Sequence, residues 1–401
     1  MTGFNRIGVA MACAVACASA AWATPVEVDW KAGETMPVAV ARPFGGFLPD
    51  GTFLVAGGSN FEGGSKAYVA DINIREQDGT WKKIGNLPRA LSDGVCCETP
   101  NGIFCAGGTD GNAKFVDAFL LSKGDDGSVA FAQLPSLPEP VAMGVAAADG
   151  TKVYVVAAKK VYCLDVAAEG QAWAEVGEVP GPAREQHVAT VQNGDQKEKM
   201  LVVYGGFDIV TKLPLRDGYG LVLSKIGANG TTRTDGTDDP WKKLAALPDN
   251  TTTIGAAFLP SGHQHVLLVG GFGDKGWVDR VLHGSEVIDP VKLGWQRKIL
   301  AYNCVTDAWC EYGEIAKVDS PRCGAAVGIR PGKTPEQYTI ILAGGEVAPR
   351  TRTSEVSVAS FRKTGKFGAT AWAVVGVYAM LMVAMAEIGR ASCRERVSVV
   401  V

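Results

Sequence analysis

The chain has 401 residues, of which 47% are hydrophobic and 20% are charged, with 39 Lys+Arg against 42 Asp+Glu. A formal net charge of -3 argues against a polyanion-binding surface, so nucleic acid is not an expected partner. The apolar fraction is ample for a large buried core, which excludes a disordered chain and a disulfide scaffold as the main architecture. Fifty glycines and twenty prolines favour a turn-rich β protein.

The N-terminal segment has the pattern of an export signal. Arg6 precedes an apolar run over residues 7–20, and Ala21 and Ala23 supply small residues at the -3 and -1 positions of a cleavage site before Thr24. This pattern predicts a secretory signal peptide over residues 1–23 and an exported protein of the periplasm or cell envelope. The alternatives are a buried N-terminal helix and, on weaker grounds, a lipoprotein site at Cys17.

The C-terminal segment predicts a membrane anchor. Residues 368–386 contain one Thr and no charged residue, which is about the length of a helix that spans a bilayer. We expect a linker over 362–370 and the start of a transmembrane helix over 371–386. Residues 387–401 have no periodicity and read like translated adapter DNA, so we expect a non-native tail on a chain whose natural form continues into a membrane domain.

The middle of the chain, residues 24–361, repeats. Short apolar runs end in pairs of small residues that begin at Gly57, Gly107, Ala157, Gly205, Gly270 and Gly344, in steps of 50, 50, 48, 65 and 74 residues. A second mark is an aromatic residue seven positions before a proline. It occurs at Trp30, Trp81, Phe131, Trp173 and Trp241, whereas Trp309 has its proline at Pro321. Six units of about 50 residues predict an all-β, six-bladed β-propeller.

Each unit is expected to be a four-stranded sheet that buries its faces against its neighbours. The diglycine should end the second strand, and the aromatic should open the outermost strand and pack between blades. The last unit has no aromatic of its own, whereas Trp30 precedes the first unit. We therefore expect residues 26–30 to complete the last blade beside residues 340–343. A β-sandwich, the alternative, explains neither the count nor this complementarity.

Seven cysteines remain outside the predicted signal and tail, and this odd number excludes complete pairing. Export would permit a disulfide, for which Cys304 and Cys310 are the best candidates. Free, buried thiols are the favoured interpretation.

The diglycine repeats with the aromatic-to-proline spacing resemble kelch propellers. Residues 180–186 (PGPAREQ), the stretch from Gly270 to Val327 and residues 345–353 (GEVAPRTRT) resemble more specifically the sialic acid mutarotase, or N-acetylneuraminate epimerase, family. In that family these segments occupy the second to fourth blades, whereas here they occupy the fourth to sixth. The chain therefore resembles the circularly permuted branch, whose members can be fused to a sodium:solute symporter. Arg350 stands where the family usually has Gly.

The resemblance implies a mutarotase that interconverts the α and β anomers of a free sialic acid without a cofactor. It implies that Glu346 is the acid/base residue and that Arg352 binds or polarises the sugar near its carboxylate. Glu185 and Asp208 are the alternatives to Glu346, and an ordinary Glu–Arg ion pair is the structural alternative. A non-catalytic kelch module that captures a sugar or a protein for a fused transporter is the alternative function.

Four arginines precede the small pairs by 15 to 22 positions: Arg42, Arg89, Arg184 and Arg322. If these positions are equivalent, their guanidiniums converge at one mouth of the channel, where they suit an acidic small-molecule sugar because the planar fork binds a carboxylate. Gln186 joins this predicted binding set. The alternative is that these arginines pair with backbone or with acids such as Asp93.

Other chemistry has little support in the sequence. His263 and His265 alternate as two zinc ligands can, but they follow a hairpin-turn signature at residues 260–262, and the sequence offers no third ligand. Walker A, HExxH and GxSxG motifs are also missing from the sequence. No metal site is therefore predicted.

Overall fold

The computed structural model describes residues 26–195, 198–227, 239–273, 295–315, 322–332, 334 and 337–363. The described sheets belong to a compact unit over Val28–Phe361. The predicted signal peptide, membrane helix and non-native tail lie outside the described residues, as does Pro321. Within the ranges given above, no helix has the length and hydropathy needed to cross a membrane.

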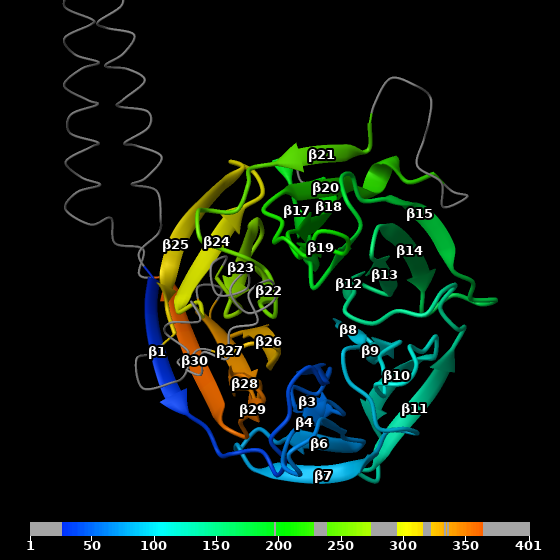
Figure 1. The fold of residues 1–401 in the computed structure, drawn as a ribbon, viewed down its shortest axis with the longest axis vertical. Coiled ribbons are helices and arrows are strands. Elements are labelled where there is room, and N and C mark those ends of the chain that lie inside the picture. Colours follow the sequence, from blue (N-terminus) through cyan, green and yellow to red (C-terminus); the bar gives the residue numbers. More distant parts are fainter. Residues whose placement is uncertain are drawn as a thin grey trace, which may run out of the picture. The chain divides into compact units, whose positions relative to one another are not determined.

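Six four-stranded sheets are arranged in a ring, and each is one blade, numbered here in chain order (Figure 1). From the axis outward, blade 1 consists of β2 (Phe44–Phe47), β3 (Phe53–Ala56), β6 (Asp71–Arg75) and β7 (Trp81–Asn86). Blade 2 consists of β8 (Val95–Thr99), β9 (Gly102–Ala106), β10 (Ala118–Lys123) and β11 (Val129–Leu134). Blade 3 consists of β12 (Val145–Asp149), β13 (Lys152–Ala157), β14 (Lys160–Asp165) and β15 (Ala174–Glu178).

Blades 4 to 6 follow the same order. Blade 4 consists of β17 (Val188–Asn193), β18 (Lys199–Tyr204), β20 (Gly218–Val222) and β21 (Trp241–Leu244). Blade 5 consists of β22 (Ala257–Ser261), β23 (His265–Val269), β24 (Lys298–Asn303) and β25 (Ala308–Glu314). Blade 6 consists of β26 (Ala326–Pro331), β27 (Gln337–Ala343), β30 (Val356–Lys363) and β1 (Val26–Ala32). A 3-10 turn, Leu223–Lys225, follows β20. The six-bladed propeller predicted from the repeats is confirmed.

The N-terminal strand closes the ring. β1 is hydrogen-bonded to β30, which neighbours β27, so residues 26–30 and 340–343 share blade 6 as predicted. Figure 1 shows β1 in blue beside β30 in orange, although more than 300 residues separate them in the chain. The last blade is thus built from both ends of the propeller.

The diglycine pairs end the second strand of five blades, as expected, because the backbone there leaves no room for side chains. At Gly107, which has a φ of 64°, an added Cβ would lie 2.2 Å from the carbonyl oxygen of Val141. Blade 3 carries the degenerate pair Ala157–Ala158. Its second and third strands are joined by a tight turn after Ala157, where Ala158 has a φ of 49°.

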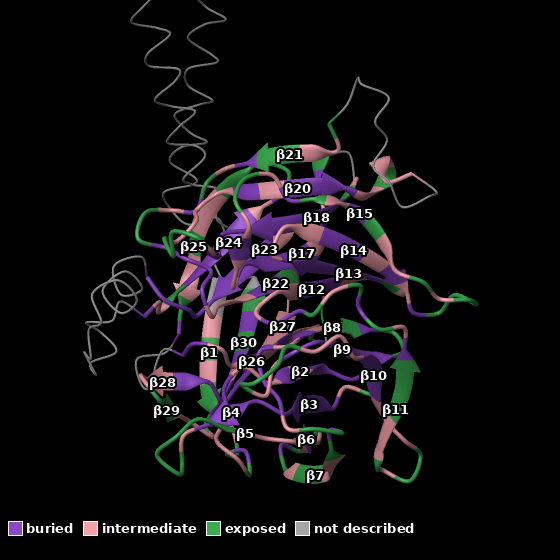
Figure 2. Ribbon diagram, turned by 45° about the vertical axis from the view of Figure 1, so that its right-hand side comes forward, coloured by how far each residue is buried: buried purple, intermediate pink, exposed green. Residues whose placement is uncertain are grey.

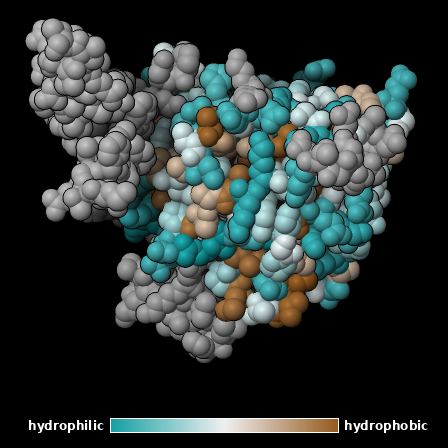
Figure 3. Space-filling model, turned by 90° about the horizontal axis from the view of Figure 1, so that it is seen from above, coloured by the Kyte–Doolittle hydropathy of each residue, from teal (hydrophilic) through white to brown (hydrophobic). Residues whose placement is uncertain are grey.

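The hydrophobic core lies between neighbouring blades. One cluster joins Phe104 of blade 2 to Val155 of blade 3, and another joins Tyr204 of blade 4 to Tyr302 of blade 5. The middle strands are therefore mostly buried, while exposed residues gather on outer strands and turns (Figure 2). The outer side seen in Figure 3 is largely hydrophilic, with hydrophobic residues in small groups.

Tryptophans bind four of the blades to the blade before them. Their indole Nε1 atoms donate to backbone carbonyls of the preceding blade in four places: Trp30 to Glu314, Trp81 to Glu34, Trp173 to Pro135 and Trp309 to Ala245, at 2.9 to 3.4 Å. The predicted packing between blades is confirmed for these four tryptophans, whereas Phe131 is 41% exposed and packs on Phe119 of its own blade. The seven cysteines of the described residues are free thiols, three buried and four half-buried, so Cys304 and Cys310 form no disulfide.

Candidate active site

Six equivalent loop positions surround the axis at one end of the channel, each just before the innermost strand of its blade. All six have a left-handed backbone. Their φ angles are 55° at Arg42, 61° at Asp93, 61° at Met143, 54° at Gln186, 67° at Gly255 and 63° at Gly324. Four of the six are not glycine, although this conformation disfavours a Cβ, so their side chains are held at the axis at some cost in strain.

Hydrogen bonds run around these six positions, and five of the six steps join backbone to backbone. In those five steps, each amide donates to the carbonyl of the neighbouring position, at 2.6 to 3.1 Å. The pairs, donor first, are Gly324 to Gly255, Arg42 to Gly324, Asp93 to Arg42, Met143 to Asp93 and Gln186 to Met143. The remaining step is made by Thr253, whose Oγ1 lies 3.3 Å from the carbonyl oxygen of Gln186. The ring fixes one mouth of the channel and directs its side chains toward each other.

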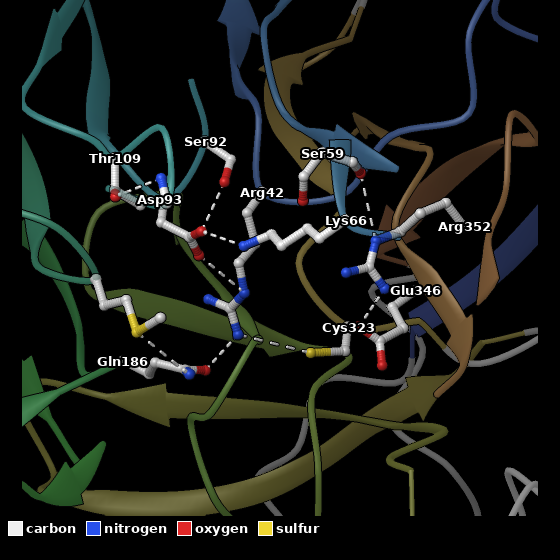
Figure 4. A network of polar contacts seen from close by, with 12 residues as sticks. Arg42, Ser59, Lys66, Ser92, Asp93, Thr109, Gln186, Cys323, Glu346 and Arg352 are labelled. Atoms are coloured by element: carbon white, nitrogen blue, oxygen red, sulfur yellow. Dashed lines mark hydrogen bonds and ion pairs between the residues drawn. The ribbon is translucent and has the colours of Figure 1, made fainter. Parts of the chain in front are cut away.

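Arg42 crosses this mouth and contacts three other blades. Its Nη2 donates to Oε1 of Gln186 and lies 4.0 Å from Sγ of Cys323, while its Nε is 3.3 Å from Oδ1 of Asp93 (Figure 4). The glycine at 324 makes this path possible, because a Cβ there would lie 2.8 Å from Cγ of Arg42. The predicted place of Arg42 and Gln186 at one mouth therefore agrees with the structure.

The charges at this mouth stabilise one another. Burial disfavours the charged form of Arg42, but Cys323, Asp93 and Glu346 together raise its pKa above the ordinary value. Burial likewise opposes ionisation of Asp93, yet Arg42, Lys66 and the Ser92 hydroxyl lower the pKa of this carboxyl below its ordinary value. Asp93 is therefore ionised and Arg42 is charged.

Glu346 and Arg352 enter the same mouth from blade 6. The two-stranded sheet of β28 (Glu346–Ala348) and β29 (Thr351–Arg352) follows the last diglycine, and Arg352 Nη1 donates to Oε2 of Glu346. Their side chains are only 10% and 9% exposed. The backbone of Glu346 is bonded to that of Cys323 at 2.8 and 3.1 Å, so the hairpin is tied to the ring beside Gly324.

A hairpin of blade 1 covers Arg352 from the other side. Ser59, in β4 (Ser59–Asn60), accepts a hydrogen bond of 3.3 Å from Arg352 Nε through its carbonyl, and the ring of Phe61 lies 5.0 Å from the guanidinium. The same hairpin continues through Lys66 to β5 (Ala67–Tyr68). Blades 1 and 6, the two blades at the ring closure, therefore build this side of the mouth.

The turn between Glu346 and Arg352 consists of Pro349 and Arg350. Arg350 has a φ of 60°, the left-handed region that glycine tolerates best. This explains why a glycine suits the position. The predicted loop is thus a short hairpin turn, and its geometry brings Glu346 and Arg352 together as expected.

The predicted convergence of four arginines is wrong for three of them. Arg184 is fully buried and binds Asp217 at 2.9 and 3.0 Å and the Gly205 carbonyl at 3.3 Å. Arg322 is 2% exposed and binds the Glu355 carbonyl at 2.6 Å and the hydroxyl of Ser357 at 2.9 Å. Both arginines therefore brace their own blades.

Arg89 lies at a rim between blades 1 and 2. It pairs with Asp117 at 3.3 Å, stacks 4.3 Å from the ring of Phe115 and is half exposed. The physical reason for the difference is position in the loop. Arg42 is the ring residue itself, whereas Arg184 and Arg322 precede the ring residue by two positions and Arg89 precedes it by four.

Comparison with known proteins bears on what this mouth does. A family model described as N-acetylneuraminate epimerase matches residues 134–377, more than half of the chain. The chain belongs to the N-acetylneuraminate epimerase family. It is 27% identical over 256 residues to the N-acetylneuraminate epimerase of Pasteurella multocida, covering 58% of this chain and 60% of that protein.

The N-acetylneuraminate epimerase of Vibrio cholerae is 26% identical over 255 residues, covering 57% of this chain and 59% of that protein. The chain thus spans about three fifths of the length of the curated relatives it matches. A solved structure titled "Structure of YjhT" is similar in fold, with a TM-score of 0.55 and 15% identity, over 80% of this chain and 95% of that one.

The match to the N-acetylneuraminate epimerase family includes Gln186, Glu346 and Arg352 but begins at residue 134, where blade 2 ends. Lys66, Phe61 and Asp93 therefore reach the mouth from a part of the chain that the family match does not cover. Sequence reasoning missed Lys66 and Phe61. A comparison of the loops after successive diglycines can find Lys66, because it follows Gly57 by nine residues much as Arg352 follows Gly344 by eight.

The alternative carboxylates have other partners. Glu185 pairs with Lys114 at 3.2 Å, and Asp208 accepts the amides of Val210 and Thr211 in its own turn at 2.7 and 3.4 Å. His263 lies in the turn between β22 and β23, His265 begins β23, and His265 Nε2 lies 3.2 Å from Nδ2 of Asn303. Across the described ranges, no group of three or more His, Cys, Asp or Glu is placed to hold a metal ion. His283 lies outside those ranges.

Proposed function

We propose that this protein is a mutarotase that interconverts the α and β anomers of free N-acetylneuraminate. The observation that carries the proposal is the Glu346–Arg352 pair at the ringed mouth of the channel, beside the cationic Arg42. Membership of the N-acetylneuraminate epimerase family supports it. A carboxylate among guanidiniums combines a group that can exchange protons with groups that attract an anionic sugar.

In this reaction Glu346 accepts the proton of the anomeric hydroxyl. The bond between the anomeric carbon and the ring oxygen then breaks, its electron pair stays on that oxygen, and the oxygen takes up a proton from solvent water while the anomeric oxygen becomes a carbonyl. The open keto form rotates and its hydroxyl attacks the other face of the carbonyl. The hydroxyl then loses its proton to water, and Glu346 returns its proton to the carbonyl oxygen. Arg352 and Arg42 orient the sugar through its carboxylate and polarise the oxygen atoms that carry charge. The residues invoked need no cofactor.

We further propose that the propeller works outside the cytoplasm, tethered through its C-terminal apolar segment. The composition of residues 1–23 and 371–386 supports this, as does the order of the family's segments, which favours the circularly permuted branch with a fused sodium:solute symporter. Export would place the sugar-binding mouth where free sialic acid arrives before transport.

The test is NMR of freshly dissolved α-anomeric N-acetylneuraminate with and without the purified protein. We expect the approach to the anomeric equilibrium to be faster with catalytic amounts of protein. Binding of the sugar without acceleration would instead support the alternative, a kelch module that captures the sugar for a transporter. Neither binding nor acceleration would refute both.

A further inference from the structure

Lys66 is a further cation at the mouth. It lies in the blade 1 hairpin, and its Nζ is 3.3 Å from Oδ2 of Asp93 and 4.9 Å from the centre of the Tyr68 ring. The Asp93 side chain is 1% exposed, whereas that of Lys66 is 35% exposed. A buried carboxylate thus holds the ammonium at the solvent side of the network (Figure 4).

We propose that Lys66 binds the carboxylate of the acidic sugar and so determines the preference for an anionic over a neutral sugar. This inference rests on the proposed function and assigns a substrate-binding role to a residue outside the matched part of the chain.

The charge balance of the network favours an anionic ligand. Arg42, Lys66 and Arg352 carry three positive charges, and the carboxylates of Asp93 and Glu346 carry two negative charges. One positive charge is in excess among these side chains. A ligand with a single carboxylate neutralises it, whereas a neutral sugar leaves it uncompensated in a partly buried site.

Among the three cations, Lys66 has the most exposed side chain. The Arg42 and Arg352 side chains are 24% and 9% exposed and bind Gln186, Asp93, Glu346 and the Ser59 carbonyl. Within the part of the chain that the structure describes, Asp93 is the hydrogen-bond acceptor of Lys66. Because an ammonium has three donors, two remain for a ligand.

The blade 1 hairpin also fixes Lys66 relative to Glu346. The hairpin bonds Arg352 through Ser59 and packs Phe61 on its guanidinium, and Arg352 in turn binds Glu346. On the other side, Asp93 joins Lys66 to Arg42, which faces Glu346. Lys66 therefore lies at the same mouth as Glu346, where it can hold the carboxylate of a sugar whose anomeric hydroxyl reaches Glu346.

The experiment compares Lys66→Met with wild type on two ligands, N-acetylneuraminate and its neutral methyl ester, using the full chain. Lys114→Met is the matched control, because Lys114 is also a lysine of a loop after a diglycine and pairs with Glu185 rather than with the network. Binding is measured by calorimetry and mutarotation by NMR. Thermal unfolding checks that each variant is folded.

We expect Lys66→Met to weaken binding of N-acetylneuraminate and raise its KM by about tenfold or more, the usual scale for a lost charged hydrogen bond. Binding of the methyl ester should change less than about twofold, and Lys66→Arg should restore most of the affinity for the acid. Equal losses for both ligands, or no loss for the acid, overturn the inference. If wild type neither binds either ligand nor accelerates its mutarotation, the proposed function is refuted. If wild type is active and only the Lys66 expectations fail, the role of Lys66 alone is refuted.

Discussion

Glu346 and Arg352 are cross-strand partners in the β28–β29 hairpin, and the guanidinium of one donates to the carboxylate of the other. Residues directly opposite each other on antiparallel strands have their Cβ atoms close on the same face. Five intervening residues are therefore enough to bring both charged groups to one place. The hairpin is in turn held by the backbone of Cys323, next to the ring that surrounds the channel.

Glu346→Gln should lower mutarotation of N-acetylneuraminate by about 100-fold or more, because it removes the proton-accepting group and keeps the side-chain shape. NMR of the fresh α anomer measures the rate. Glu185→Gln, which alters the pair with Lys114, is the control and should stay near wild type. Near-normal acceleration by a folded Glu346→Gln protein would exclude Glu346 as the acid/base residue and would leave Glu185 or Asp208 as the candidates.

Arg184→Met should destabilise the protein by about 3 kcal/mol, because it leaves the Asp217 carboxylate and the Gly205 carbonyl without their buried partner. The affinity of the remaining folded protein for N-acetylneuraminate should not change. Chemical denaturation and calorimetry check the two parts. Arg89→Met, which removes an exposed pair, should cost less than about 1 kcal/mol. A variant at Arg184 with normal stability and weak sugar binding would contradict the bracing role.

Arg350→Gly should stabilise the protein by about 0.5–1 kcal/mol, because glycine adopts the left-handed backbone of this turn without a Cβ penalty. Arg350→Ala is the control and should show little gain, since it keeps the Cβ. Thermal unfolding measures both. A gain for alanine equal to that for glycine would point to the lost charge rather than to the backbone.

His187 should make stability depend on pH between about 4 and 6.5. Burial, with the charge of Arg184 as the second cause, lowers the pKa of His187 to about 3. Because the ordinary pKa is near 6.5, the unfolded chain binds a proton in this range that the folded protein excludes. The free energy of unfolding contributed by this group therefore falls as the pH falls, by up to about 1.4 kcal/mol per pH unit.

His187→Gln should remove this contribution while it offers an amide to the Val156 carbonyl, which lies 3.2 Å from the imidazole Nε2. Denaturation of both proteins at about pH 5 and pH 6.5 measures the difference. We expect wild type to lose about 1.6 kcal/mol more than the variant over this interval. Parallel losses in the two proteins would show that His187 titrates normally.

The sequence by itself determined the features that depend on contacts within one repeat. The spacing of the diglycines and aromatics predicted six blades, the ends of the second strands and the share of blade 6 supplied by residues 26–30. It also predicted that Glu346 and Arg352 meet, because a short hairpin after the last diglycine fixes their distance. Strand register and local turns decide these contacts, and both require particular residues at regular intervals in the sequence.

Only the tertiary structure decided which side chains face the axis. Arg42, Arg184 and Arg322 look alike in the sequence, yet a difference of two positions in the loop sends the first across the channel and the other two into their blades. Ser59 and Phe61, in the hairpin that carries Lys66, contact Arg352 of blade 6 only because the ring closes between blades 1 and 6. Contacts across the axis depend on the angle at which all six blades pack, and no single repeat encodes that angle.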